Sequence, residues 1–330
     1  MDPMRRRIVA AVTTAIVLLA LPASAGTITD QRRARAGAAF VASMQKPNGS
    51  IPAFSPIGSS ADAVVSFVAA QARAGAMADA LAYLRTQVRR GNIDGIGLVA
   101  KVTQAVVAAG RDPRSFGGEN LVGRLRSRIR DDGHIGRSAV FDHALAVLAL
   151  EAAGLRPSKA VTGWLLDAQC PSGGWAYDAP YDSSIDDDDC FDGSVDDFFT
   201  ADTNTTAYVV MALEHVGRNG YGVSPFPFFA DSRDATHGGW GYTSGFGTDA
   251  NSTALVIQAY EAADRAIPSG GLAALRALQD LDCGAWSFNY TGDVPGPPDV
   301  GATIGAIPGV LRRAFPILGP GAGAGPSRGC

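Results

Sequence analysis

Five Ala-rich stretches of the chain are apolar around most of a helical circumference, and all but one end in Gly. They are VVSFVAAQARAG from Val64, VAKVTQAVVAAG from Val99, HALAVLALEAAG from His143, TAYVVMALEHVG from Thr206 and TALVIQAYEAAD from Thr253. Apolar residues recur at spacings of three and four, and Gly is the residue preferred just after a helix C-terminus. The pattern therefore predicts five helices that are buried on nearly all sides.

More ordinary amphipathic stretches alternate with these helices, and they begin near Phe40, Leu81, Leu125, Trp164, Phe228 and Leu275. An Asp stands at or near the start of several apolar helices and marks units of about 40 to 60 residues: Asp62, Asp142, Asp202, Asp249 and Asp299. Six hairpins of one apolar and one amphipathic helix pack naturally as two concentric rings. We therefore predict an all-α protein, an (α/α)6 double-ring toroid, formed by residues 26–318 as one domain.

Three segments carry a Gly and Trp after an outer-ring helix. WLLDAQCPSGGW has Gln169, Gly173 and Trp175, LRALQDLDCGAW has Gln279, Gly284 and Trp286, and a third segment keeps only Gly238-Gly239-Trp240. This pattern resembles the QW repeat of squalene and oxidosqualene cyclases, within the superfamily of α/α-toroid terpenoid cyclases and protein prenyltransferases. The resemblance implies a structural role for these residues, in which the three Trp side chains join helices. A role as ligand contacts is the alternative.

The acid motif of that family is altered here. Squalene-type cyclases protonate their substrate with the middle Asp of D-x-D-D-T-A, and the matching segment is Asp202-Thr203-Asn204-Thr205-Thr206-Ala207. An amide cannot donate a proton as an acid does, so Asn204 argues against the ordinary cyclase mechanism at this position. The pattern returns as Asp249-Ala250-Asn251-Ser252-Thr253-Ala254. Two equivalent copies predict helix N-caps, ligand contacts at helix N-termini, or both.

Composition narrows the class of protein. The chain has 330 residues, of which 46% are hydrophobic and 18% charged, with a formal net charge of −4. This apolar content supports a large core and excludes a disordered chain, a collagen-like rod or a short disulfide-rich knot. No basic cluster follows the first few residues, so a nucleic-acid partner is not expected.

The first 25 residues resemble a secretory signal peptide. Arg5, Arg6 and Arg7 precede an apolar run, and Ala23-Ser24-Ala25 forms a cleavage site of small residues. Cleavage would leave a secreted or cell-envelope protein with no segment long enough to cross a membrane.

The four Cys residues of an exported chain favour disulfides. Our first choice pairs Cys170 with Cys190 and leaves Cys283 for Cys330, although four cysteines allow three connectivities. At the C-terminus, residues 319–330 are rich in Gly and Pro and predict a flexible tail.

An Asp-rich insertion spans residues 178–202 and contains no Lys or Arg. Hard oxygen ligands suit Ca²⁺ in an exported protein. The insertion is either a solvated loop or a calcium-stiffened lid, and its candidate metal ligands are Asp186, Asp187, Asp188, Asp189, Asp192, Asp196 and Asp197. No other cofactor is indicated.

These observations lead us to expect an exported, non-catalytic protein that binds an apolar or amphipathic small molecule in a central cavity. The candidate contacts are residues at the inner-helix starts and aromatic residues of the adjoining loops: Asp142, His143, Trp175, Tyr177, Asp202, Asn204, Trp240, Tyr242, Asp249, Asn251 and Trp286. Two alternatives remain. One is a variant class II terpenoid cyclase that uses Asp202, Asp249 or Asp142 as its acid, and the other is an interaction module of the cell envelope. For His143, a helix-capping or buried neutral imidazole is a further interpretation.

Overall fold

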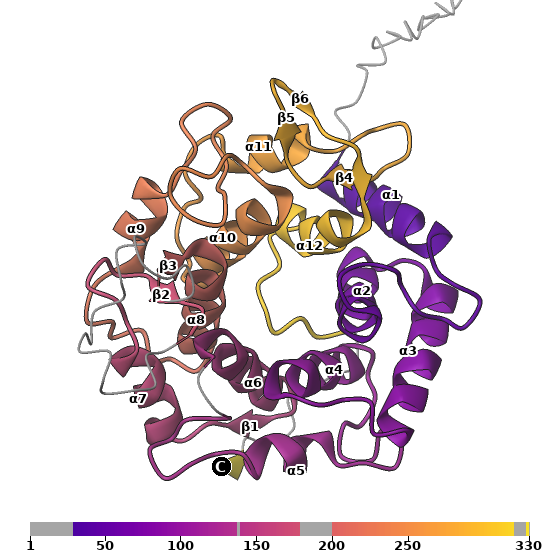
Figure 1. Cartoon of the computed structure of the whole chain (residues 1–330), viewed down its shortest axis with the longest axis vertical. Helices are drawn as coiled ribbons and strands as arrows, with labels where there is room; N and C mark the ends of the chain where they lie inside the picture. Colours follow the sequence, from indigo (N-terminus) through magenta and orange to yellow (C-terminus); the bar gives the residue numbers. More distant parts are fainter. Residues whose placement is uncertain (1–28, 137–138, 179–199, 320–327, 330) are drawn as a thin grey trace, which may run out of the picture.

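The computed structural model describes residues 29–136, 139–178, 200–319 and 328–329. The described residues form twelve helices. The outer ones are α1 (Asp30–Ser43), α3 (Ala74–Arg89), α5 (Leu121–Arg126), α7 (Lys159–Asp167), α9 (Pro225–Asp231) and α11 (Gly271–Ala277), and the inner ones are α2 (Pro56–Ala70), α4 (Ile96–Ala108), α6 (Val140–Ala152), α8 (Thr203–His215), α10 (Ala250–Ala262) and α12 (Val300–Val310). Figure 1 shows the two groups as concentric rings. The predicted double-ring toroid is confirmed.

The inner ring is closed. Each of its helices packs against the next one along the chain, and α12 returns to pack against α2. At this junction the Ser66 hydroxyl donates to the Ile304 carbonyl at 2.8 Å. The outer ring closes at the same place, where the Arg276 guanidinium of α11 binds both carboxylate oxygens of Asp30 in α1 at 2.7 and 2.6 Å.

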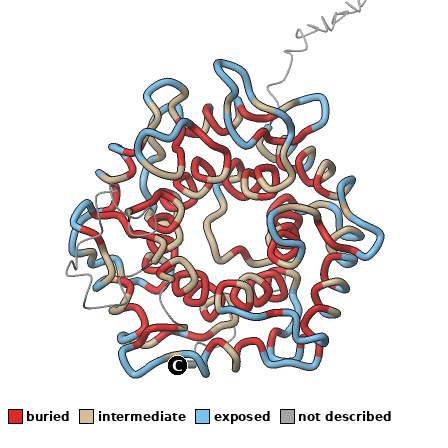
Figure 2. Tube along the Cα trace, in the orientation of Figure 1, coloured by how far each residue is buried: buried red, intermediate tan, exposed pale blue. Residues whose placement is uncertain are grey.

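Burial separates the rings as the hydrophobic pattern predicts. Nine of the thirteen residues of α6 are buried, against five of the sixteen in α3. Figure 2 shows the inner helices almost wholly buried, with exposed residues concentrated at the periphery. Because the inner helices are apolar on all sides, burial between the outer ring and their own neighbours is the arrangement that removes their apolar surface from water.

Short strands join the rings. They are β1 (Leu155–Arg156), β2 (Trp175–Ala176), β3 (Ala201–Asp202), β4 (Trp286–Ser287), β5 (Tyr290–Thr291), β6 (Val294–Pro295), β7 (Pro298–Asp299) and β8 (Arg328–Gly329). β2 pairs antiparallel with β3, β4 with β7, and β5 with β6, while β1 and β8 are parallel. In two of these pairs a Trp lies opposite the Asp that opens an inner helix, as with Trp175 and Asp202.

Glutamines at the ends of three outer helices hydrogen-bond the next outer helix or the segment before it. The Gln169 amide nitrogen donates to the carbonyls of Gly173 and Val223 at 2.9 and 2.6 Å. Gln45 makes the matching pair of bonds to Gly49 and Ala76, and Gln279 to Gly284 and Arg33. The glutamine of the predicted repeat thus joins neighbouring hairpins.

Three predicted segments lie wholly or mainly outside the described residues. One is the Gly- and Pro-rich tail of residues 319–330, of which only 319 and 328–329 are described. Residues 1–28 include the predicted signal peptide, and residues 179–199 include all seven candidate calcium ligands. Among the described residues, no group of three or more His, Cys, Asp or Glu side chains could hold a metal ion. No helix in the described part of the chain is long and apolar enough to cross a membrane.

The two predicted disulfides have different outcomes. Cys283 is an exposed free thiol, so its predicted pairing with Cys330 is wrong. Cys283 follows α11, whereas the chain end reaches β1 through β8, on another side of the ring in Figure 1. Cys170 is buried, and because its predicted partner Cys190 lies outside the described residues, that pairing stays a prediction.

Candidate functional site

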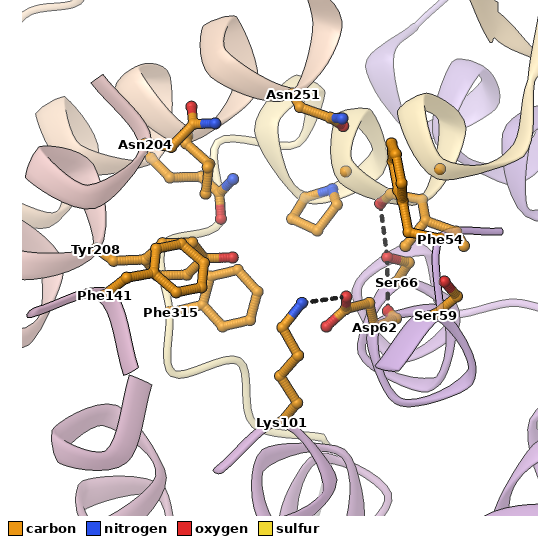
Figure 3. A pocket seen from close by; sticks show the side chains of 16 residues that line it. Phe54, Ser59, Asp62, Ser66, Lys101, Phe141, Asn204, Tyr208, Asn251 and Phe315 are labelled. Carbon is orange, nitrogen blue, oxygen red and sulfur yellow. Dashed lines mark hydrogen bonds and ion pairs between the residues drawn. The ribbon is translucent and has the colours of Figure 1, made fainter. Parts of the chain in front are cut away.

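A cavity of about 190 Å³ lies at the centre of the inner ring, and all six inner helices contribute to its wall. Figure 3 shows the side chains that line it. The second residues of four inner helices face it: Phe141 in α6, Asn204 in α8, Asn251 in α10 and Gly301 in α12. The starts of these helices therefore form one end of the cavity, which we call the entry end.

One turn deeper, an ion pair spans the cavity wall. The Lys101 ammonium of α4 donates to the Asp62 carboxylate of α2 at 2.7 Å, with 26% and 35% of the two side chains exposed. Burial lowers the pKa of Lys101, but the Asp62 carboxylate, together with Tyr208 and Asp142, outweighs this effect and raises the pKa above its ordinary value. An ammonium group has three N–H donors. One of them is used in the bond to Asp62, so Lys101 has further donors for a molecule in the cavity.

An aromatic cluster forms the wall beside Lys101. The Tyr208 ring meets Phe141 edge-on, with ring centres 5.2 Å apart, and lies 5.8 Å from Phe315. Phe141 also stacks on Tyr177 at 5.4 Å. Burial raises the pKa of Tyr208 to about 12, so its hydroxyl stays protonated at neutral pH. At the entry end, Phe54 is 89% exposed and lines the same cavity.

Several polar groups in the cavity wall lack hydrogen-bond partners among the residues that the structure describes. The Asn251 amide and the Tyr208 hydroxyl make no hydrogen bond to any residue that the structure describes, and the Gln258 Oε1 atom is buried with no partner. The Asn204 oxygen accepts only a long bond of 3.5 Å from the Thr203 hydroxyl. Buried polar groups are usually hydrogen-bonded, so these groups are available to a molecule in the cavity.

The candidate acids Asp202 and Asp249 cap inner helices instead of lining this cavity. Asp202 Oδ1 accepts from the Thr205 amide, and Asp249 Oδ1 from the Ser252 amide, both at 2.7 Å. Burial raises the pKa of each carboxyl to about 6 against the opposing effect of these hydrogen bonds. The segment matched to the cyclase acid motif does place a residue in the cavity, and that residue is the amide Asn204.

Asp142 reaches across to the neighbouring inner helix. The α4 N-cap, Gly95, has no side chain to satisfy the amides of the first turn, and the Asp142 carboxylate accepts from the Gly97 amide. Burial raises the pKa of Asp142, while the Gly97 amide and Lys101 lower it. The third candidate acid therefore also serves a helix N-terminus.

His143 is a buried neutral imidazole. Its Nδ1 atom accepts from the Ile135 amide at 3.0 Å, which leaves Nε2 to donate to the Val161 carbonyl at 3.0 Å. Burial lowers its pKa to about 3. In three later repeats a Thr takes the same place and accepts from the amide of Trp175, Trp240 or Trp286.

The three Trp side chains are fully buried and none lines the central cavity. Each indole nitrogen donates to the carbonyl of a residue in the preceding outer helix, at 2.6 Å to Leu165, 2.7 Å to Phe229 and 2.8 Å to Leu275. The structure thus places them in the packing between the rings.

The last two predicted contacts lie near the start of α8. The pKa of Tyr177 is raised by burial and by the Asp142, Asp178 and Asp202 carboxylates, and the Tyr242 carbonyl accepts from the Thr203 amide at 2.9 Å. Of the eleven predicted ligand contacts, only Asn204 and Asn251 line the central cavity.

Among the cavity residues that sequence reasoning missed are Asp62 as an ion-pair partner, Lys101, Tyr208, Gln258 and Phe315. One signal was present. Asp62 and Lys101 each stand within an otherwise apolar stretch of an inner helix, where a charge needs a partner.

No protein-family model matches the chain, and no curated protein matches it in sequence. Similar solved structures include a D-mannose isomerase (13% identity, TM-score 0.62, covering 89% of this chain and 100% of that one). A second is a variant of the type II terpene cyclase MstE from Scytonema with geranylgeranyl dihydroxybenzoate bound (12% identity, TM-score 0.58, covering 86% of this chain and 97% of that one). A third is an inactive variant of an α-1,6-mannanase of Salegentibacter sp. with α-1,6-mannotriose (12% identity, TM-score 0.55, covering 86% of this chain and 98% of that one). These likenesses show that the chain has the α/α-toroid fold.

Proposed function

We propose that the protein is exported and binds, without converting it, a small amphipathic molecule in the central cavity. The observation that carries this proposal is the unused hydrogen-bonding capacity of one cavity wall. Among the described residues, the Asn251 amide, the Tyr208 hydroxyl and Gln258 Oε1 have no hydrogen-bond partner, and the Lys101 ammonium has donors beyond its bond to Asp62. A ligand that accepts and donates hydrogen bonds would satisfy them. The aromatic cluster beside them favours a ligand that also has an apolar part.

The ligand's polar head is best held at the level of Lys101, with Asn204 and Asn251 one turn nearer the entry end. Its apolar part then lies against Tyr208, Leu255 and Phe315. The cavity of about 190 Å³ is smaller than the roughly 300–1,000 Å³ of sites for drug-sized molecules. This volume favours a small ligand and argues against a triterpene substrate.

The described acids support binding over proton-transfer catalysis. Asp62 lines the cavity but is ion-paired with Lys101, and the three candidate acids accept backbone amides at helix N-termini. Protonation of an alkene requires an undissociated acid directed at the substrate. At the position that matches the proton-donating Asp of the cyclase motif, this chain has Asn204. The cavity itself weighs against a pure interaction module, which would have a filled centre.

Export rests on the signal-like segment of residues 1–25 and is tested separately. The mature protein should begin near Gly26, which N-terminal sequencing of protein recovered from outside the cytoplasm would show. A chain that keeps its first 25 residues in the cytoplasm would contradict export without affecting the cavity proposal.

Isothermal titration with octanoate and 1-octanol tests the binding site. These probes share one apolar tail and carry a charged or a neutral hydrogen-bond acceptor. Lys101→Met should weaken octanoate binding by about 10- to 100-fold, because a hydrogen bond to a charged group contributes about 1.5–3 kcal/mol. Lys159→Met is the matched control, since Lys159 is exposed on α7. In Lys101→Met the Asp62 carboxylate loses its ion-pair partner, and its unpaired charge could itself repel octanoate. The double variant Asp62→Asn/Lys101→Met removes that charge. Equal affinity in wild type and both Lys101 variants would contradict the proposed site.

A further inference from the structure

The chain closes one end of its own ring. After α12, residues 311–319, which we call the floor segment, leave the inner ring and cross its centre toward α2 and α4 (Figure 1). The central cavity of Figure 3 lies between this segment and the entry end, with Phe315 in its wall. A C-terminal segment of the domain therefore supplies the far boundary of the cavity.

Arg313 fastens the floor segment to α2. Its guanidinium donates to the carbonyls of Val68 and Ala69, in the last turn of α2, at 3.4 and 3.1 Å. The same side chain donates to the Leu318 carbonyl at 3.1 Å, which links the two halves of the floor segment to each other. A cation at a helix C-terminus is favourable because the last carbonyls lack helical partners and carry partial negative charge.

The segment is also held at α8 and α4. The Phe315 amide donates to the sulfur of Met211, less than one turn beyond Tyr208 along α8, at 3.4 Å. At the far end, Gly319 lies so close to the Ala108 carbonyl of α4 that a Cβ there would overlap it, and Ile317 is 4% exposed. Attachments at three inner helices make the floor segment a fixed part of the barrel.

We infer that Phe315 determines ligand specificity by setting the depth of the cavity and hence the longest apolar tail that fits. The inference rests on the proposed function, because it assigns the tail to the end of the cavity beyond Lys101. The Phe315 side chain lies against Tyr208, and the Phe315 backbone is attached at Met211, which is deeper in the barrel than Tyr208. The aromatic side chain therefore lies between the level of the ion pair and the far end of the helix barrel. A longer tail would have to displace this side chain.

Truncation of Phe315 should lengthen the permitted tail. Phe315→Ala removes the aromatic ring but leaves the backbone attachment at Met211 intact. Each methylene that can then be buried adds about fourfold to affinity, which is the factor that corresponds to about 0.8 kcal/mol per buried CH₂. Wild-type affinity for straight-chain carboxylates should rise with length and then stop rising, and in Phe315→Ala this limit should move by at least two carbons.

The experiment measures dissociation constants for even-numbered carboxylates from hexanoate to tetradecanoate by isothermal titration. Phe315→Val is a milder variant in case Phe315→Ala fails to fold, and a shift of the limit toward longer chains is expected for it too. Phe246→Ala is the matched control, because Phe246 is 63% exposed and does not line the cavity. The same length limit in wild type and in the Phe315 variants would overturn the inference.

Benzene provides a second readout that needs no polar head. A new apolar cavity of this kind binds benzene, so benzene should raise the melting temperature of Phe315→Ala by more than it raises that of wild type or Phe246→Ala. If no carboxylate binds either protein while benzene stabilises Phe315→Ala, the proposed ligand class fails and the role of Phe315 as the floor stands. Absence of the benzene effect in a folded Phe315→Ala protein would refute the floor itself.

Discussion

Replacement of Asp202 by Asn should stabilise the protein at neutral pH. Asp202 is fully buried, and its Oδ1 atom caps α8 by accepting from the Thr205 amide at 2.7 Å. Burial raises the pKa of this carboxyl from 3.8 to about 6, although hydrogen bonds from Thr205 and Tyr242 lower it. An amide side chain keeps a capping oxygen and carries no charge, so it removes the cost of the buried carboxylate.

The magnitude follows from the change in pKa. One pKa unit corresponds to 1.36 kcal/mol, so a pKa raised from 3.8 to about 6 makes the ionised carboxyl cost about 3 kcal/mol. Between about pH 4 and pH 6 the native state binds more protons than the unfolded state, so this contribution to stability falls as pH rises and is constant above about pH 6. Loss of the charge at the α8 N-terminus offsets up to about 1 kcal/mol. Asp202→Asn should therefore gain about 2 kcal/mol at pH 7.5 and little at pH 4.

Urea unfolding followed by circular dichroism, at about pH 4.5 and pH 7.5, measures this difference. Asp79→Asn makes the same chemical change at an exposed position of α3 and should have almost no effect at either pH. Asp202→Ala loses the cap and should cost about 1 kcal/mol at the lower pH. Destabilisation by Asp202→Asn at pH 7.5 would refute the reasoning, because it would show that the native state requires the charged carboxylate.

Three further results are expected. A Cβ on Gly97 would overlap the Asp142 carboxylate, so Gly97→Ala should lower the free energy of unfolding by about 2 kcal/mol or more, whereas Gly163→Ala, with open space around it, should be neutral or stabilising; urea unfolding compares them. The pKa of His143 is lowered to about 3, so the unfolded state binds more protons below about pH 6.5 and stability falls as pH falls; His143→Thr should flatten this dependence between about pH 7 and pH 5. If the Asp-rich segment of residues 178–202 holds Ca²⁺, a chelator should lower the melting temperature, and an unchanged melt would retire that hypothesis.

The repeat pattern was enough to predict the fold. Apolar helices and amphipathic helices alternate along the sequence, and the closed double ring is the packing that buries both patterns. The equivalent segments at Asp202 and Asp249 also predicted N-caps, because Asp, Ser and Thr next to a helix start have a local role that needs no tertiary information.

The centre of the cavity could not be predicted in the same way. Asp62 and Lys101 are 39 residues apart and meet only because α2 and α4 are neighbours in the ring. Phe315 follows the last helix, and nothing in its local sequence shows that the chain turns back across the ring. Such contacts depend on ring closure, whereas the Trp and His143 positions, which we named among the candidate ligand contacts beside a structural interpretation, lie between the rings.

Mass spectrometry of small molecules released from the mature protein, purified from its own host, tests the central claim most directly. We predict one unmodified amphipathic molecule in near-stoichiometric amount with wild type and with Lys159→Met, and its loss from Asp62→Asn/Lys101→Met. Release of a substrate together with its cyclised or cleaved product would contradict binding without conversion. Equal retention of the molecule by the double variant would contradict its place in the central cavity.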